Sequence, residues 1–347
     1  MSDIWVVTSY AGQIIDPENF HEQPVFGSEL ALLEIFSRLS GVTVFISKPA
    51  GYIYEKYNIT WRSEKDWNEL IKSPPKTIVI SRYIGSFIDY IMPKECKIYL
   101  WVHDVFPHPA YKGINLNNNF MNNIARRLSG IVTVGTSQIK EIIEPRYKLD
   151  PGLFITIKNG INAIYDGSHL TRQRAPMSFV YSSGPERGLF NLLKMWPAIV
   201  NKWPYATLQI FHDLKEDHFK QIREMNLERV YPMGKVTQTV LFEKLKLIDY
   251  WLYPCSFFET CCTTAIEMQY HGIICISNDL GALKENNNGI IISGDDFGNQ
   301  AFKMLCSLEE NRTKKEEIRQ AQYLWAREQT WDNRAKDWAK VIKPTTI

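Results

Sequence analysis

Short apolar runs alternate with amphipathic segments along the chain, and this alternation predicts a doubly wound α/β architecture. In the first half we expect strands at residues 4–8, 42–46, 77–81, 97–102, 130–134 and 154–158. The segments with helical periodicity between them are residues 28–39, 64–72, 119–128 and 137–145. The second half repeats the pattern, with expected strands at 178–182, 207–211, 250–253 and 272–277 and expected helices at 189–202, 217–225, 240–247 and 314–341.

A polar, basic stretch at residues 168–176 separates the two halves and predicts a domain boundary. We therefore expect an N-terminal domain over residues 1–170, a second domain over residues 171–328 and a terminal helix over residues 329–347. Trp331 and Trp338 are seven residues apart, so they lie on one face of that helix. An exposed stripe of this kind is a liability, so we expect it to be buried.

Composition excludes several classes of protein. The chain has 347 residues, 45% hydrophobic and 22% charged, which is typical of a folded globular protein. A net charge of +2 gives no electrostatic case for a nucleic-acid partner. The chain has neither an apolar run of membrane-spanning length nor a signal-like N-terminus, so we expect a cytoplasmic protein with at most weak peripheral membrane contact. The six cysteines include no CxxC pair, which favours free buried thiols over a zinc site.

Two glutamates, Glu259 and Glu267, are the most informative residues for function. Glu259 falls in a loop after an apolar strand, and Glu267 falls about two turns further on, in the first part of an expected helix. Thr263 and Thr264 lie between them at the helix start, where unpaired N–H groups and the helix dipole suit a phosphate. Ionised carboxylates accept hydrogen bonds from hydroxyls, so the segment suits a sugar joined to a nucleotide. Two solvated surface acids are the alternative, but the run is apolar on both sides.

The spacing of Glu259 and Glu267 matches the E-x7-E motif of retaining glycosyltransferases of the GT-B fold, and the chain resembles glycosyltransferase family 4. Thr260 and Cys262 stand where the family commonly has glycines, so the chain resembles a divergent branch. The resemblance implies two facing Rossmann-like domains with a C-terminal helix crossing back to the first. It also implies that Glu267 binds the ribose and Glu259 holds the sugar.

Arg187, in a turn with Gly188 after the first strand of the second half, resembles the family's basic-glycine turn. The resemblance implies that Arg187 neutralises the leaving diphosphate through charge-assisted hydrogen bonds. An exposed turn arginine is the alternative. A second upstream basic residue, common in the family, is absent because Val180 to Ser182 stand in its place.

Two further segments belong to the first half. Gly27 and Ser28 open the first long helix and resemble a family turn that approaches the reacting centre, although Ser28 is equally explained as an N-cap. His103 ends a strand where the family often has a histidine near the transferred sugar. It could bind a donor hydroxyl or orient the acceptor, and a structural histidine is the alternative.

We therefore predict a retaining hexosyltransferase that moves a sugar from a UDP- or GDP-sugar to a hydroxyl of a glycan or other acceptor. The nucleotide-sugar is a co-substrate, and no other cofactor is expected. Asp295 and Asp296 are typical of a surface turn rather than a metal-binding DxD loop, so we expect metal-independent transfer. The alternatives are a non-catalytic nucleotide-sugar-binding or structural GT-B protein and a GT-B epimerase.

Overall fold

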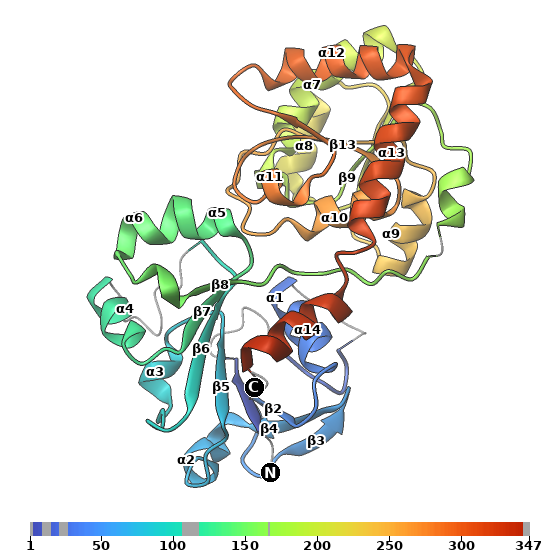
Figure 1. Cartoon of the computed structure of the whole chain (residues 1–347). Coiled ribbons are helices and arrows are strands. Elements are labelled where there is room, and N and C mark those ends of the chain that lie inside the picture. The colour runs from blue at the N-terminus through green and yellow to red at the C-terminus, as the bar shows by residue number, and fades with distance from the viewer. Residues whose placement is uncertain (1–2, 9–14, 21–26, 106–117, 166, 343–347) are drawn as a thin grey trace. The chain divides into compact units, whose positions relative to one another are not determined.

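The computed structural model describes residues 3–8, 15–20, 27–105, 118–165 and 167–342. The chain divides into two compact units, residues 1–160 with 331–347 and residues 161–330. Each unit is built on its own, largely parallel sheet (Figure 1). The second unit therefore begins at Ile161 rather than at residue 171. The reason is local, because Ile161 forms a β-bridge with Thr330 and Tyr165 is hydrogen-bonded to Tyr270.

The first sheet has the order β3-β4-β2-β1-β5-β6-β7-β8 in the described residues, with only β3 antiparallel to its neighbour. Its strands are β1 (Ile4–Val7), β2 (Val42–Ile46), β3 (Ile53–Lys56), β4 (Ile59–Ser63), β5 (Thr77–Ser81), β6 (Lys97–Val102), β7 (Gly130–Thr133) and β8 (Phe154–Thr156). Its helices are α1 (Gly27–Phe36), α2 (Trp67–Leu70), α3 (Ser86–Asp89), α4 (Asn118–Ala125), α5 (Thr136–Gln138), α6 (Glu144–Tyr147) and α14 (Trp331–Ile342).

Helices cover both faces of this sheet, so the strands β1, β2, β5 and β7 are buried at every position. Side chains of β6 alternate between the faces. Ile98, Leu100 and Val102 belong to a core completed by residues of α2, α4 and α6. Trp101 points to the other face, where it contacts Phe36 of α1 and Trp338 of α14.

The hairpin β3–β4 is not among the strands predicted from the sequence. Tyr57 and Asn58 form its two-residue turn, and both have positive φ. This is the backbone that a tight hairpin of twisted strands requires. The sequence signal is weak since Tyr occupies a position where Asn or Gly is usual.

The C-terminal helix α14 is part of the first unit. Trp331 and Trp338 are both buried, and Trp338 packs against Phe36 and Trp101 with ring centroids 5.6 Å and 5.1 Å away. The Tyr99 hydroxyl donates to the carbonyl of Val341 at 3.0 Å. The apolar stripe seen in the sequence is thus the surface that attaches the chain's end to the first sheet.

The second sheet is entirely parallel, with the order β11-β10-β9-β12-β13-β14. Counted within the unit, this is the order 3-2-1-4-5-6 of dinucleotide-binding folds. Its strands are β9 (Ser178–Tyr181), β10 (Thr207–Ile210), β11 (Val230–Pro232), β12 (Tyr250–Tyr253), β13 (Ile274–Asn278) and β14 (Ile290–Ile292). Its helices are α7 (Leu189–Lys202), α8 (Glu216–Glu224), α9 (Gln238–Leu245), α10 (Thr263–Tyr270), α11 (Leu283–Asn286), α12 (Phe297–Glu310) and α13 (Arg312–Ala326).

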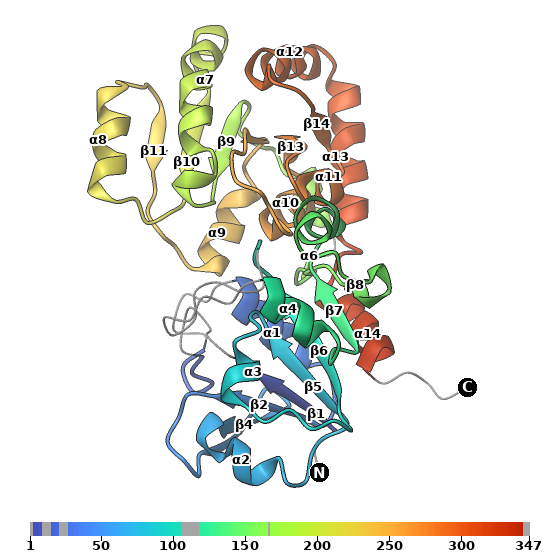
Figure 2. The same ribbon diagram turned by 90° about the vertical axis from the view of Figure 1, so that its left-hand side faces the viewer.

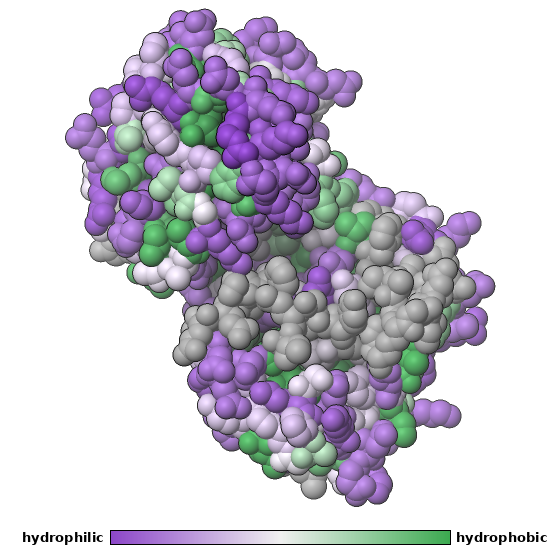
Figure 3. Space-filling model, turned by 180° about the vertical axis from the view of Figure 1, so that it is seen from behind, coloured by the Kyte–Doolittle hydropathy of each residue, from purple (hydrophilic) through white to green (hydrophobic). Residues whose placement is uncertain are grey.

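The second unit has one large core, in which helices again pack on both faces of the sheet (Figure 2). The stacked or edge-on rings of Phe179, Trp196 and Tyr250 lie at its centre. On the face shown in Figure 3, the second unit is mostly hydrophilic, with apolar residues scattered among the hydrophilic ones. Among the described residues, none of the helices is both long and apolar enough to cross a membrane.

Replacing Trp338 with alanine should destabilise the first unit. Trp338 is fully buried between two aromatic rings, and truncating a buried Trp typically costs about 3–5 kcal/mol. Urea unfolding followed by tryptophan fluorescence would measure the change. Lys336→Ala, at an exposed position of the same helix, is the matched control and should have almost no effect. Equal stability of the two variants would show that α14 is not anchored by this residue.

Candidate functional site

Strands β9 and β12 lie next to each other in the second sheet. These neighbouring strands lie where the order of the second sheet reverses, and ligands of such sheets bind outside the carboxyl ends of the strands at that point. The loop after β9 carries Arg187 and Gly188, and the loop after β12 leads to Glu259. Topology therefore brings the two most distinctive sequence motifs of the second half to one edge.

Arg187 and Glu259 form an ion pair at this edge. Nη1 of Arg187 lies 2.9 Å and 2.8 Å from the two carboxylate oxygens of Glu259. The Tyr253 hydroxyl, at the end of β12, donates to Oε1 of the same carboxylate at 2.8 Å. Glu259 is only 2% exposed, whereas the Arg187 side chain is 36% exposed and its guanidinium lies 4.4 Å from the centre of the Phe257 ring. The carboxylate is therefore enclosed, whereas the Arg187 side chain is partly exposed.

The electrostatics of the pair keep Arg187 charged. Burial alone would lower the pKa of its guanidinium, but the neighbouring Glu259 carboxylate raises that pKa above its ordinary value. Cys255 lies close by, and burial together with Glu259 raises the pKa of its thiol to about 11. The thiol is thus protonated at neutral pH and is not a nucleophile.

Two glycines allow the loops to approach each other. Gly188 has φ +135°, and a Cβ there would overlap the carbonyl oxygen of Pro254. Gly281, with φ +59°, lies against the backbone of Glu259, and a Cβ there would overlap the Glu259 carbonyl oxygen. Backbone hydrogen bonds fix the contacts, from Ser256 N to Arg187 O at 3.0 Å and from Ala282 N to Glu259 O at 2.7 Å.

Helix α10 begins beside Glu259. Its N-cap residue, Cys262, has left-handed backbone angles of φ 53° and ψ 63°. The Asn286 side chain donates to the carbonyl of Cys261 and holds this turn. Thr263 and Thr264 are half-buried in the first turn of the helix, where the amides have no acceptor within the helix. The structure thus positions a helix N-terminus next to the Arg187–Glu259 pair.

Glu267 lies further along α10 and makes a different contact. Its Oε1 accepts a hydrogen bond of 3.3 Å from Gln238, the first residue of α9. The carboxyl group is half-buried, and burial raises its pKa to about 7, opposed only by the Gln238 contact. Near neutral pH Glu267 is therefore a mixture of the acid and the carboxylate.

In the first unit, the predicted residues gather at the carboxyl ends of β1, β5 and β6. Gly27 is exposed, and Ser28 donates to the buried Glu29 carboxylate at 2.7 Å instead of capping α1. Arg82 bridges Glu29 at 3.3 Å and Asp104 at 2.6 Å. His103 is buried beside Asp104, and burial lowers the pKa of its imidazole to about 3. His103 is therefore neutral at physiological pH.

Arg82 and Tyr253 are not among the site residues predicted from the sequence. Arg82 follows β5 with φ +80°, a backbone angle that a non-glycine residue rarely adopts. Observed strain of this kind is a pointer to function. Arg82 also lines a small cavity with Thr8, Ser28 and Ser81. No sequence pattern reveals a positive φ at an arginine, and Tyr253 looked like an ordinary strand residue.

Three residues near the predicted first-unit segments lie outside the described residues: the loop glycine Gly12, Phe26 directly before Gly27, and His108, five residues after His103. Asp296 is the N-cap of α12 and accepts from the amide of Asn299 at 3.4 Å. Within the described ranges, no group of three or more His, Cys, Asp or Glu side chains could hold a metal ion. All six cysteines are free, and five are buried.

Comparison with known proteins identifies the fold. The chain matches no family model and no curated protein sequence. Among solved structures, it is similar to HepE of Anabaena in complex with UDP and glucose, with a TM-score of 0.71 at 14% identity over 99% of this chain and 100% of that one. OtsA gives a TM-score of 0.70 at 11% identity over the full length of both chains. The pneumococcal O-GlcNAc transferase GtfA, in complex with UDP and GlcNAc, gives 0.61 at 17% identity over 86% of this chain and 63% of that one.

These similarities confirm the predicted fold class. The chain has the α/β fold of two Rossmann-like domains that is found in GT-B glycosyltransferases. At such low identity the likeness concerns the fold alone. Function has to be argued from the site.

Gly281→Ala should disrupt the site more than Gly294→Ala, although both glycines have a positive φ. Gly294 also has a positive φ, of +93°, but nothing lies within 4 Å of a Cβ there. Gly294→Ala should cost only about 1 kcal/mol of backbone strain. Gly281→Ala adds a clash with the Glu259 backbone, so a larger loss of stability and weaker ligand binding are expected. Chemical denaturation would measure both variants, and equal losses would show that the close approach to Glu259 is unimportant.

Proposed function

We propose that the chain is a retaining, metal-independent hexosyltransferase that uses a UDP-sugar donor and a hydroxyl acceptor. The observation that carries the proposal is the partly exposed Arg187, held by Glu259 beside the start of α10 at the strand-order reversal. A cation and a helix N-terminus together suit a diphosphate. HepE and GtfA, which share the fold, have been crystallised with UDP, and this supports UDP over GDP.

The proposed chemistry is substitution at the anomeric carbon. The bond from that carbon to the β-phosphate oxygen breaks, and its electron pair stays on the phosphate. The acceptor oxygen bonds the same carbon on the same face, and its proton passes to the departing phosphate. Arg187 and the amides at Thr263 and Thr264 stabilise the charge that develops on the leaving group. These groups take the place of a metal ion.

The two glutamates have different proposed tasks. Glu267 accepts hydrogen bonds from the ribose hydroxyls. Glu259 is enclosed by Arg187 and Tyr253, so in the ligand-free chain it orients the guanidinium. A bound diphosphate competes for Arg187, and Glu259 then has capacity to hold hydroxyls of the sugar. Two carboxylates eight residues apart thus serve the two ends of the donor.

The proposed role of His103 depends on its neutral state. A neutral imidazole can donate one hydrogen bond and accept another, whereas it offers no positive charge to a phosphate. His103 is therefore assigned to a hydroxyl of the transferred sugar or acceptor. Gly27 and Ser28 are assigned to the same end of the donor, through the start of α1.

Turnover is tested by UDP release from UDP-glucose. The chain should release UDP, and Arg187→Ala should reduce kcat by roughly a hundredfold or more, since removing one group that stabilises transition-state charge has effects of this size. EDTA should leave the rate unchanged. Arg223→Ala, which removes an exposed arginine of the same unit, is the control. Binding without release would favour the non-catalytic alternative, and conversion of UDP-glucose to another UDP-sugar would favour the epimerase.

Donor affinity should depend on pH through Glu267. The raised pKa of about 7 means that the carboxyl group is mostly protonated at pH 6 and mostly ionised at pH 8. Only the ionised form makes charge-assisted bonds to ribose, so the Kd for UDP-glucose should be about tenfold higher at pH 6 than at pH 8. Calorimetry at both pH values would measure this. Glu267→Gln should bind weakly and with no such pH dependence, and an unchanged pH dependence in that variant would refute the ribose assignment.

A further inference from the structure

The second unit has a surface hollow of about 700 Å³ at the edge opposite the Arg187–Glu259 pair. Its lining includes Asp249, which directly precedes β12, and Pro176, which lies just before β9. These are the amino ends of the parallel strands whose carboxyl ends carry Arg187 and Glu259. Residues of α12 and α13 complete the lining. The volume lies in the range of small-molecule sites.

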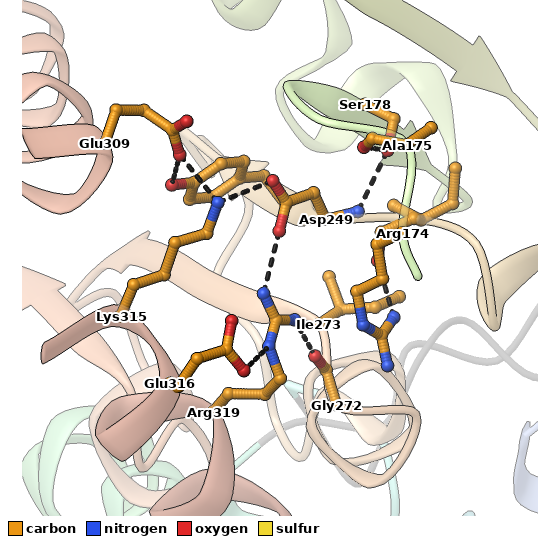
Figure 4. A network of polar contacts seen from close by, with 12 residues as sticks. Arg174, Ala175, Ser178, Asp249, Gly272, Ile273, Glu309, Lys315, Glu316 and Arg319 are labelled. Atoms are coloured by element: carbon orange, nitrogen blue, oxygen red, sulfur yellow. Dashed lines mark hydrogen bonds and ion pairs between the residues drawn. The ribbon is translucent and has the colours of Figure 1, made fainter. Parts of the chain in front are cut away.

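The acidic residues of the hollow are all engaged by two cations of α13 (Figure 4). The buried Asp249 accepts from Lys315 at 2.6 Å and from Arg319 at 2.8 Å. Lys315 also contacts Glu309 at 2.6 Å, and Arg319 contacts Glu316 at 3.0 Å. The Glu309 carboxylate accepts a further bond from the Tyr250 hydroxyl. Each acid of the hollow is therefore already paired with at least one of these two cations.

Three arginines remain without a carboxylate. The lining contains five basic and three acidic residues, and no described carboxylate forms an ion pair with Arg172, Arg174 or Arg312. Arg174 donates only to backbone carbonyls, those of Leu245, Ile248 and His271. Burial, with the nearby Arg319, lowers the pKa of Arg174 to about 10, so it stays charged at neutral pH.

Structural roles account for Arg174 but not for the other two. Arg174 bonds carbonyls at the C-terminal ends of α9 and α10, where a cation is favourable. Arg172 is exposed. It contributes to lowering the pKa of the Glu243 carboxyl, but that carboxylate already forms an ion pair with Lys246 at 2.5 Å. Arg312 is exposed at the first position of α13, the end at which the helix dipole disfavours a cation.

We propose that this hollow binds a small polyanion that carries at least two phosphate groups. Arg172 and Arg312 are its direct ligands, since guanidinium groups match phosphate geometry with paired hydrogen bonds. Arg174 and the N-terminus of α13 add positive potential. The hollow lies at the other end of the strands from the donor site, so this proposal does not depend on the proposed transferase activity.

Pyrophosphate is the probe, measured by calorimetry in 150 mM NaCl with the full chain. Because pyrophosphate also suits the Arg187 site, binding is compared in the wild type, in Arg187→Ala and in the double variant Arg172→Ala/Arg312→Ala. We expect Arg187→Ala to retain one binding event, and we expect that event to weaken roughly tenfold or more when Arg172→Ala/Arg312→Ala is added to Arg187→Ala. Arg172→Lys/Arg312→Lys should bind pyrophosphate with an affinity between those of the wild type and the double alanine variant. Lysine keeps the positive charge but loses the paired hydrogen bonds of the guanidinium group.

The matched control is Lys220→Ala/Arg223→Ala, which removes the same charge from exposed positions of α8 in the same unit. This control should leave pyrophosphate binding unchanged. Equal weakening by both double variants would reduce the effect to net charge and overturn the proposal. So would the absence of pyrophosphate binding to Arg187→Ala. Melting temperatures should match the wild type, since both arginines are exposed, and UDP binding by Arg172→Ala/Arg312→Ala should be normal.

Discussion

The ion pair between Arg187 and Glu259 is the contact on which the candidate donor site depends. It joins the loops that follow two neighbouring strands, and one partner is enclosed while the other is partly exposed. A buried carboxylate without a partner costs several kcal/mol, so the Arg187 guanidinium offsets the burial of Glu259, and Glu259 in turn holds Arg187 in place. Tyr253 supplies a second hydrogen-bond donor to Glu259 from within the sheet. Only Nη1 of the guanidinium donates to Glu259, which leaves Nε and Nη2 for an anion.

The loops can meet only because of the glycines around them. Gly188 and Gly281 lie where any side chain would overlap a neighbouring backbone, at Pro254 and at Glu259. Cys262 adopts left-handed backbone angles, and the Asn286 side chain holds this turn by donating to the carbonyl of Cys261. The chain thus forms a left-handed turn at a residue that carries a side chain.

The opposite edge of the second sheet shows a different use of charge. Asp249 is buried with Lys315 and Arg319, so α13 is attached to the base of β12 by two ion pairs. The cost of removing these charges from water offsets much of their mutual attraction, so the ion pairs add little net stability. Removing one partner, however, would leave a buried charge uncompensated. The exposed arginines of the hollow, Arg172 and Arg312, take no part in this attachment. Their surplus charge is the reason to assign a ligand to the hollow.

The sequence by itself determined the fold class, six strands of the first sheet (β1, β2 and β5 to β8), four strands of the second (β9, β10, β12 and β13), and the segments that meet at the second sheet's carboxyl edge. Short apolar runs in the sequence predict strands that are buried on both faces. The E-x7-E spacing and the Arg187–Gly188 turn are likewise local patterns that the sequence shows directly. Tertiary structure alone decided what these residues touch. Glu259 looked like a free sugar ligand and is bonded to Arg187 and Tyr253, while Ser28 looked like an N-cap and is bonded to Glu29. The hairpin at Tyr57, the strained Arg82 and the start of the second unit at Ile161 were also not readable. The physical reason is that hydrogen-bond partners, burial and positive φ are set by residues distant in the chain, which periodicity and spacing do not report.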